Sequence, residues 1–290
     1  MTSAMKSSAL AASWHGIFAA MQPRLLLLWL LGLWLPTVLV TFPLWQAMGA
    51  QLDHSVHAAE WARHFDLGVA VDLTGAMARA GYSISAGLVP GLVLTVLLSP
   101  WLTGMSVTAA RSPRALGFGA LLQGGLSEYG RMFRLLLLSL LPMGVAIAAG
   151  GGMFSWASTH AEKAILASSA DHYNLIAMIV AGIAFVVAHT TVEAGRAQFA
   201  ADPQLRSAIR AWWRGLMLVL RRPFSTLGVY LLISVIGLLI AAGFGMWRTH
   251  VAPLGALSIV GAFVLTQAIS ASLGWMRSAR LFALTRLVAR

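Results

Sequence analysis

The sequence predicts an all-α polytopic membrane protein with six transmembrane helices arranged as three helical hairpins. The composition is 59% hydrophobic and only 10% charged, whereas soluble domains carry about 25% charged residues. The apolar residues gather in six long runs, each near the ~20 residues that cross a bilayer as a helix. The predicted spans are residues 25–46, 86–108, 132–154, 174–195, 224–247 and 253–276.

The basic residues lie mostly on one side of this predicted topology. When the loops are assigned alternately to the two sides, 16 of the 20 Lys and Arg residues fall on the side of both termini. Only Arg63, Arg79, Lys163 and Arg248 lie opposite. Cytoplasmic loops carry such an excess, so we expect both termini in the cytoplasm. The bias of 18 arginines against 2 lysines favours a bacterial inner membrane.

The net charge of +11 could indicate nucleic-acid binding if it were taken alone. The bases stand beside the ends of spans, however, where they set orientation and bind anionic lipid headgroups. We therefore expect membrane lipids as partners, with a soluble or membrane protein as the alternative, and no nucleic acid.

A short helix is predicted before the first span, over residues 8–21, in the cytoplasmic interface. Its apolar side chains recur at helical spacing, at Leu10, Trp14, Ile17, Phe18 and Met21. Pro23 then begins the first span.

The longest outer loop, residues 47–85, contains a second amphipathic pattern over 57–80. Its apolar residues recur every fourth position, at Trp61, Phe65, Val69, Leu73 and Met77. This spacing predicts a helix on the outer surface that packs on the bundle as a lid.

Residues 203–222 form the clearest amphipathic segment. Asp202 is a suitable N-cap, Pro203 suits the first helical position, and Pro223 ends the helix. The predicted apolar face consists of Leu205, Ile209, Trp212, Leu216 and Val219. We expect this helix to lie flat under the membrane. The residues expected to face lipid or a partner are Arg206, Arg210, Trp212, Trp213, Arg214, Arg221 and Arg222.

The chain also divides into three similar units within a single membrane domain spanning 1–290. Each unit has an interfacial segment, an outgoing span, a returning span and a small-residue–Arg ending. The endings are VTAAR at Arg111, VEAGR at Arg196 and MRSAR at Arg280. This pattern predicts parallel hairpin repeats at 8–111, 113–196 and 203–280.

Polar groups inside the spans are few, and such groups are costly in hydrocarbon. His189, Glu193 and Arg196 share one helix face near the cytoplasmic end of span four. Pairing of Glu193 with Arg196 offsets the cost of burial. We interpret this cluster as a structural clip, with a proton- or ligand-handling site or a headgroup contact as alternatives. Gln267 in span six, near Thr266 and Ser270, predicts interhelical hydrogen bonding.

Several predicted spans contain prolines and glycines. Pro36, Pro43, Pro90, Pro100 and Pro142 are predicted to interrupt and kink the first three helices. Kinks and glycines can build a cavity or gate, although close helix packing is the preferred explanation. Gly124 and Gly125 in the inner loop predict a turn between interfacial helices.

No catalytic motif is present: the sequence lacks GxSxG, a Walker-type phosphate loop and HExxH. The absence of cysteine excludes thiolate catalysis and Cys-ligated metals. His54, His57 and His64 have spacing that could bind a metal weakly, but a solvated surface helix is preferred. We therefore expect no enzyme activity, no cofactor and no metal site.

The stretch VEAGRAQFAADPQLRSAIRAWWRGLMLVLRRPFSTLGVYLL, from Val192 onward, resembles a widespread group of bacterial six-span proteins whose activity is not established. Members share acid-x-x-Arg, an Ala-rich amphipathic helix and Arg-Arg-Pro before a span. The acid here is Glu193, where members often have Asp, and Arg221, Arg222 and Pro223 match the later motif. The resemblance implies a six-span inner-membrane protein and implies no activity.

Two functional classes remain. In the first, the protein is a permease-like or accessory membrane subunit that docks a partner or anionic lipid through its cytoplasmic amphipathic helices. In the second, it is an autonomous small-molecule or lipid transporter with a cavity among kinked helices. The first is preferred because ion-driven transporters usually place ionisable groups within the membrane, and these spans have few.

Overall fold

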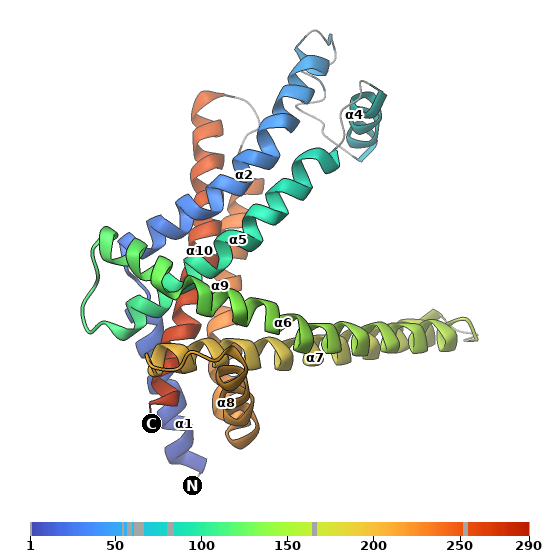
Figure 1. The fold of residues 1–290 in the computed structure, drawn as a ribbon. Coiled ribbons are helices and arrows are strands. Elements are labelled where there is room, and N and C mark those ends of the chain that lie inside the picture. Colours follow the sequence, from blue (N-terminus) through green and yellow to red (C-terminus); the bar gives the residue numbers. More distant parts are fainter. Residues whose placement is uncertain are drawn as a thin grey trace. The chain divides into compact units, whose positions relative to one another are not determined.

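The computed structural model describes residues 2–53, 55–56, 60, 67–79, 84–163, 167–251 and 255–289, and every regular element in this part of the chain is a helix (Figure 1). The helices are α1 (Thr2–Ala19), α2 (Pro23–Leu52), α4 (Leu67–Arg79), α5 (Ile84–Arg111), α6 (Phe118–Ala161), α7 (Ala167–Ala201), α8 (Ala208–Arg221), α9 (Pro223–Thr249) and α10 (Ala256–Val288). Six of them, α2, α5, α6, α7, α9 and α10, are long and apolar enough to cross a membrane. The predicted all-α polytopic fold is therefore confirmed.

A proline marks the boundary between an interfacial segment and the span that follows it. Helix α2 begins at Pro23 and α9 begins at Pro223. Proline suits the first turn of a helix because its missing N–H would have no partner there. No proline stands between Gly117 and the third span, so this interfacial segment continues directly into the span as the 44-residue helix α6.

Prolines within the spans do not end their helices. Helix α2 continues through Pro36 and Pro43, α5 through Pro90 and Pro100, and α6 through Pro142. These prolines therefore do not break the first three helices, and the predicted kinks at them stay a prediction. Membrane helices tolerate proline because neighbouring groups can satisfy the freed backbone atoms, and hydrocarbon penalises any unfolded alternative.

The chain forms two compact units. Unit 1 contains Met1–Met21, Thr103–Ser234 and Arg277–Arg290, and unit 2 contains Gln22–Leu102 and Val235–Met276. Helices α5, α9 and α10 each contribute to both units. The single membrane domain and the threefold repeat stay predictions.

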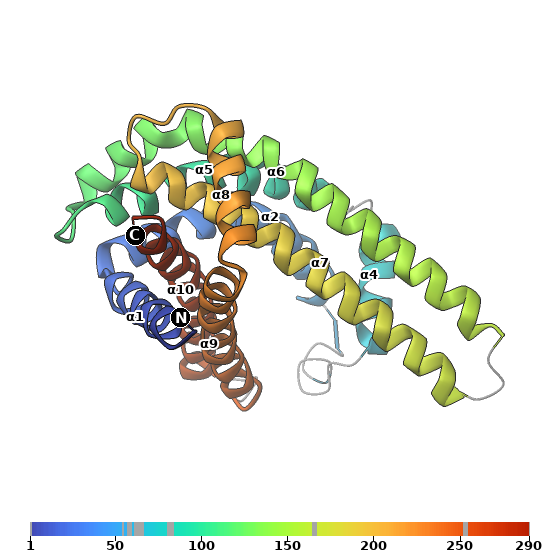
Figure 2. The same cartoon turned by 90° about the horizontal axis from the view of Figure 1, so that it is seen from below.

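In unit 1, α6 and α7 lie side by side as a long hairpin, and α8 packs on them (Figures 1 and 2). The contact between α7 and α8 depends on two glycines. A Cβ atom on Gly215 would lie 2.5 Å from the Gly195 nitrogen, and one on Gly195 would lie 3.2 Å from the Trp212 Cα. The two backbones therefore touch, as small residues allow in membrane helices.

The other interfacial segments of unit 1 dock in the same way. A Cβ on Gly16 of α1 would lie 2.5 Å from the Ala279 oxygen of α10. In α6, a Cβ on Gly124 would lie 2.5 Å from the side chain of Thr108 in α5. Gly124 and Gly125 are buried within the continuous helix α6, so the predicted turn at these glycines is wrong. Close approach to α5, and not chain reversal, explains their small size.

Each interfacial segment thus uses small residues for its closest helix contact and leaves several large apolar residues exposed, although Ile17 and Leu121 are buried as well. In α1, Ala12, Gly16 and Ala20 are buried, whereas Trp14 and Phe18 are exposed and stacked on each other. The exposed side chains of α1 fit the predicted interfacial position, because aromatic residues favour the headgroup level.

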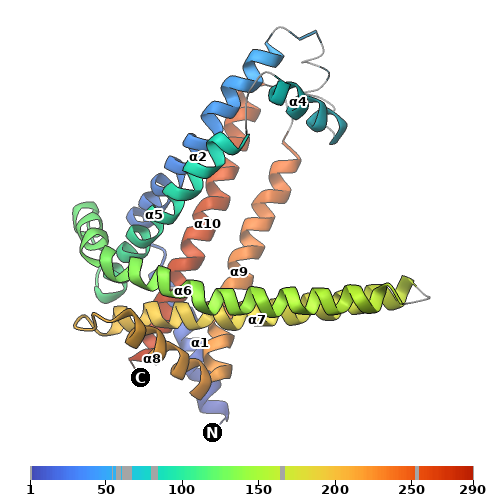
Figure 3. The same ribbon diagram turned by 45° about the vertical axis from the view of Figure 1, so that its right-hand side comes forward.

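In unit 2, α4 packs on α2 (Figure 3). Met77 and Ala47 are buried together, with Leu44, Met48 and Leu52 packed around them. A helix is therefore present over Leu67–Arg79, within the predicted 57–80, and apart from Glu60 the remaining residues of that stretch lie outside the described part of the chain. Trp61 and Phe65 lie outside the described residues.

Candidate functional site

The polar cluster predicted on α7 is centred on Glu193, which is buried in unit 1. The predicted ion pair is present: Arg196 Nη1 lies 2.9 Å from Glu193 Oε1. His189 Nε2 is 4.0 Å from the same oxygen. Helical spacing explains both contacts, because residues three and four apart share a face.

A second arginine, from a distant part of the chain, also faces this carboxylate. Arg280 of α10 lies 3.7 Å from Glu193 through Nη2, and its side chain is 5% exposed against 3% for the glutamate. The guanidinium also donates to Ser234 Oγ at 3.1 Å and lies 4.8 Å over the ring of Tyr230. A cation over an aromatic face gains further attraction when water is excluded.

Tyr230 contacts both His189 and Arg280 of this network. Its hydroxyl is 3.0 Å from His189 Nδ1. The cluster therefore joins α7, α9 and α10 through the carboxylate of Glu193, the Arg280 guanidinium and the Tyr230–His189 contact. Arg277, one turn before Arg280, also lies within unit 1.

A second buried carboxylate, Glu128 of α6, was not among the predicted site residues. It pairs with Arg111 Nη1 at 2.6 Å and with Arg131. Arg111 also donates to the Phe199 carbonyl at 2.6 Å, and Arg131 to the Pro203 carbonyl at 2.8 Å. Glu128 thus holds two arginines against the end of α7 and the turn that follows it.

The three small-residue–Arg endings of the sequence share this role. Arg111, Arg196 and Arg280 each pair with a buried glutamate. That common motif was the signal for Arg111 and Arg280 as site residues. No comparable motif marks Glu128 or Tyr230.

The chemistry of both clusters fits a structural role, in which a buried ion pair holds neighbouring helices together. Each carboxylate faces at least two cations, and a buried charge is tolerated only when it is paired and hydrogen-bonded. Glu193 is engaged by arginines and is therefore a poor candidate for a general base. The only buried side-chain atoms without a partner in these two clusters are Glu128 Oε2 and Arg280 Nε.

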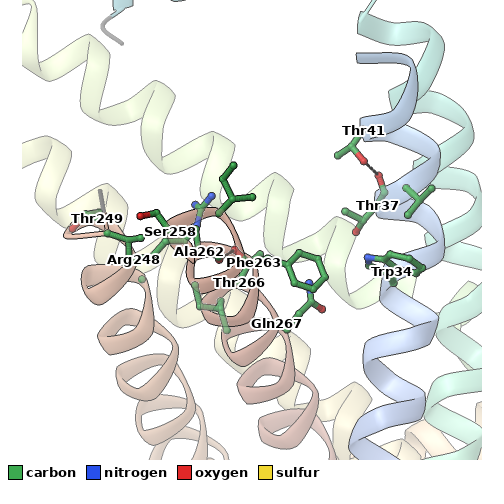
Figure 4. Close-up of a pocket in the computed structure, with 15 residues that line it drawn as sticks. Trp34, Thr37, Thr41, Arg248, Thr249, Ser258, Ala262, Phe263, Thr266 and Gln267 are labelled. Atoms are coloured by element: carbon green, nitrogen blue, oxygen red, sulfur yellow. Dashed lines mark hydrogen bonds between the residues drawn. The ribbon is translucent and has the colours of Figure 1, made fainter. Parts of the chain in front are cut away.

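Gln267 belongs to unit 2, whereas His189, Glu193 and Arg196 belong to unit 1. It lines a crevice of about 640 Å³ among α2, α9 and α10 (Figure 4). Other polar side chains in its wall are Thr37, Thr41, Arg248 and Ser258.

Interhelical hydrogen bonding at Gln267 stays a prediction, since the described hydrogen bonds of its neighbours lie within α10. Thr266 and Ser270 donate to carbonyls of their own helix, those of Ala262 and Thr266. Among the described residues, Gln267 has no hydrogen-bond partner, so its amide remains available within the crevice.

The predicted amphipathic helix exists as α8, but it begins later than expected. Ser207 is the N-cap, and its hydroxyl accepts from the Arg210 N–H at 3.3 Å. Asp202 and Pro203 do not start the helix. Asp202 instead accepts from the Gln204 N–H at 3.1 Å, and its carboxylate also pairs with Arg214 at 3.2 Å. This turn stabilises a non-helical connection after α7.

The predicted apolar face of α8 is also only partly buried. The buried residues are Ala208, Ala211, Gly215 and Val219, whereas Ile209 is 67% exposed. Close backbone packing on α7 favours the small residues. The predicted lipid- or partner-facing arginines are all exposed, namely Arg206, Arg210, Arg214, Arg221 and Arg222.

The two tryptophans of α8 face different surroundings. Trp213 is exposed. Trp212 is half-buried, and its indole N–H donates to Thr191 Oγ1 at 3.1 Å. Trp212 therefore contributes to docking on α7, although it was predicted to face lipid or a partner.

No group of three or more metal-ligating side chains occurs in the described part of the chain. His54, His57 and His64 lie outside it. No protein-family model, curated protein or solved structure matches the chain. The resemblance to six-span bacterial proteins stays a prediction.

Proposed function

We propose that this is a multi-pass protein of the bacterial inner membrane, with both termini in the cytoplasm, that binds anionic lipid headgroups through α8. It would act as a permease-like or accessory membrane subunit and not as an enzyme. The observation that carries the proposal is the division of α8 into three faces.

At 100° per residue, the three faces of α8 follow one another around the helix. The first consists of small residues and packs on α7. The second is apolar and exposed, with Ile209, Trp213 and Leu220 at 67, 55 and 62% exposure. The third is basic and contains Arg210, Arg214 and Arg221. A helix with adjacent apolar and basic faces suits the boundary between acyl chains and headgroups.

The basic face is available for ligands. Among the described residues, Arg210 and Arg221 have no ion-pair partner, and Arg214 has only the exposed pair with Asp202. Arg214, Arg221 and Arg222 also line a hollow of about 430 Å³ together with Trp213. Arginine is well suited to phosphate because its donors form a planar fork.

The test compares two variants that remove the same charge. Arg210→Gln/Arg221→Gln alters α8, and Arg114→Gln/Arg286→Gln removes two exposed arginines elsewhere in unit 1. Each basic residue near an anionic surface contributes about 1 kcal/mol, so the α8 variant should bind phosphatidylglycerol about 30-fold more weakly. Lipid binding is measured by native mass spectrometry of the purified full-length protein.

The control variant should bind like the wild type. Equal losses in both variants would show that the effect is net charge and not α8, and unchanged binding in both would refute the proposal. Retention of a soluble protein by the wild type and not by the α8 variant, with lipid binding unchanged, would favour partner docking.

The crevice in unit 2 supports a second candidate, the transporter. Its wall combines the unpartnered amide of Gln267 with the hydroxyls of Thr37 and Thr41 and the cation Arg248 (Figure 4). Polar groups that line a cavity within spans are typical of transport pathways.

Because the chain has no cysteine, a single introduced one reports on access to this crevice. If water and solutes enter, Thr41→Cys should react with a membrane-impermeant maleimide. Phe42→Cys, on the next residue and exposed on the apolar surface, should not react. Equal protection of both positions would exclude an aqueous crevice.

A further inference from the structure

An apolar groove lies where α6, α7 and α8 meet in unit 1. Its volume is about 520 Å³. Leu141 and Val145 of α6, Ala184 and Val187 of α7, and Leu216 of α8 form its wall. Its main polar groups, the Thr191 hydroxyl and the Trp212 indole N–H, are hydrogen-bonded to each other. The groove therefore offers contacts to an apolar ligand only.

A basic pocket lies beside this groove, between α6 and the beginning of α8. Its volume is about 560 Å³, and Arg134, Leu138, Arg206 and Ile209 contribute to its wall. Leu138 precedes Leu141 of the groove by less than one turn of α6, so the two hollows follow each other along the same pair of helices.

Both arginines of this pocket have hydrogen-bond donors without a partner among the described residues. Arg134 uses Nε to donate to the Gly130 carbonyl at 3.0 Å, which leaves its terminal nitrogens. Arg206 has no hydrogen-bond partner among the described residues. Two exposed guanidinium groups without a carboxylate between them attract an anion, and phosphate matches their donor geometry.

We propose that these two hollows form one site for a single anionic phospholipid. The phosphate group lies between Arg134 and Arg206, and an acyl chain occupies the groove. The proposal rests on the proposed attachment of α8 to anionic headgroups and specifies one site for it.

The dimensions agree with this occupant. From Arg134 to Val145 the helix rises about 16 Å at 1.5 Å per residue. One leaflet of a bilayer contributes about 15 Å of the ~30 Å hydrocarbon core. A basic pocket at one end and an apolar groove of this length thus match a headgroup and its chain. A small soluble anion would use the pocket alone.

The experiment measures lipid adducts of the delipidated full-length protein by native mass spectrometry. The wild type should retain one phosphatidylglycerol molecule in preference to phosphatidylcholine. Arg134→Gln/Arg206→Gln should weaken this adduct on the order of tenfold or more. Arg114→Gln/Arg286→Gln removes equal charge outside the pocket and outside α8 and should keep it.

Substitutions that fill the groove test binding of the acyl chain separately from binding of the phosphate group. Ala184→Trp should weaken binding of long-chain phosphatidylglycerol and leave binding of the dihexanoyl form unchanged. Ala149→Phe fills the same groove from α6 and serves if Ala184→Trp does not fold. Glycerol phosphate that competed as well as the lipid would show a free-phosphate site and would overturn the proposal.

Failure of this inference differs from failure of the proposed function. If Arg210→Gln/Arg221→Gln weakens phosphatidylglycerol binding and Arg134→Gln/Arg206→Gln does not, binding is spread over α8: the proposed function stands and the single site is wrong. If neither pair nor either groove variant changes lipid binding, both are wrong.

Discussion

At the scale of single residues, two glutamates carry most of the polar chemistry in unit 1. Glu193 and Glu128 are each 2% exposed, and each faces one arginine from another helix and one from its own. Hydrocarbon and protein interiors both penalise an unpaired charge, so removal of one partner costs more than removal of the pair.

This asymmetry gives the first prediction. Arg280→Met should destabilise the protein by about 1.5–3 kcal/mol, because it removes the hydrogen bond to Ser234 and one of the two arginines that face Glu193, which keeps Arg196. Arg280→Met combined with Glu193→Gln should recover part of that loss. The free energy of unfolding is measured by denaturant titration in mixed micelles.

The exposed pair Asp202–Arg214 is the matched control. Its side chains are 42 and 51% exposed, and exposed pairs contribute about 0–1 kcal/mol. Arg214→Met should therefore change the unfolding free energy little. Equal effects of Arg214→Met and Arg280→Met would contradict the assignment of the Glu193 cluster as a buried clip.

At the scale of elements, the three interfacial segments pack by the same rule. Each places glycine against the end of a returning span: Gly16 on α10, Gly124 on α5 and Gly215 on α7. Each leaves several large apolar side chains exposed, among them Trp14, Leu126 and Trp213. Interfacial helices that dock in this way keep those side chains free for the acyl-chain boundary.

The glycine contact of α8 gives the second prediction. Gly215→Ala should move α8 away from α7, because the new Cβ would lie 2.5 Å from the Gly195 nitrogen and 2.9 Å from the Thr191 oxygen. Overpacking of this kind costs about 1–3 kcal/mol. Amide hydrogen exchange of residues 208–221 should become faster.

Gly144→Ala is the control, since no atom lies within 4 Å of its new Cβ. Alanine at this helical position should be neutral or stabilise by up to about 1 kcal/mol. Unchanged exchange in α8 of the Gly215→Ala protein would show that this helix is not held by backbone contact.

At the scale of the whole molecule, six long apolar helices and a one-sided charge distribution define how the chain enters a membrane. The structure confirms the helices. Orientation is a prediction that depends on 16 of 20 basic residues sharing a side.

Single cysteines in the cysteine-free chain test that orientation. Gln204→Cys, in the turn before α8, should be protected from an impermeant maleimide in intact cells and react after lysis. His250→Cys, at the end of α9, should react in intact cells. Labelling of position 204 from the outside would reverse the topology and every role given to α8.

The sequence alone determined the six helices, their polarity and the ion pair between Glu193 and Arg196. Long apolar runs have one stable form in hydrocarbon, and neighbours on a helix face are fixed by its period. Only the tertiary structure decided that Arg280 and Tyr230 join Glu193, that Glu128 holds Arg111, and that α8 buries Ala211 and Gly215. In a membrane protein large apolar residues can face lipid at no cost, so hydrophobicity does not identify the packed face of a helix. Small residues identify it only when the opposing backbone is known.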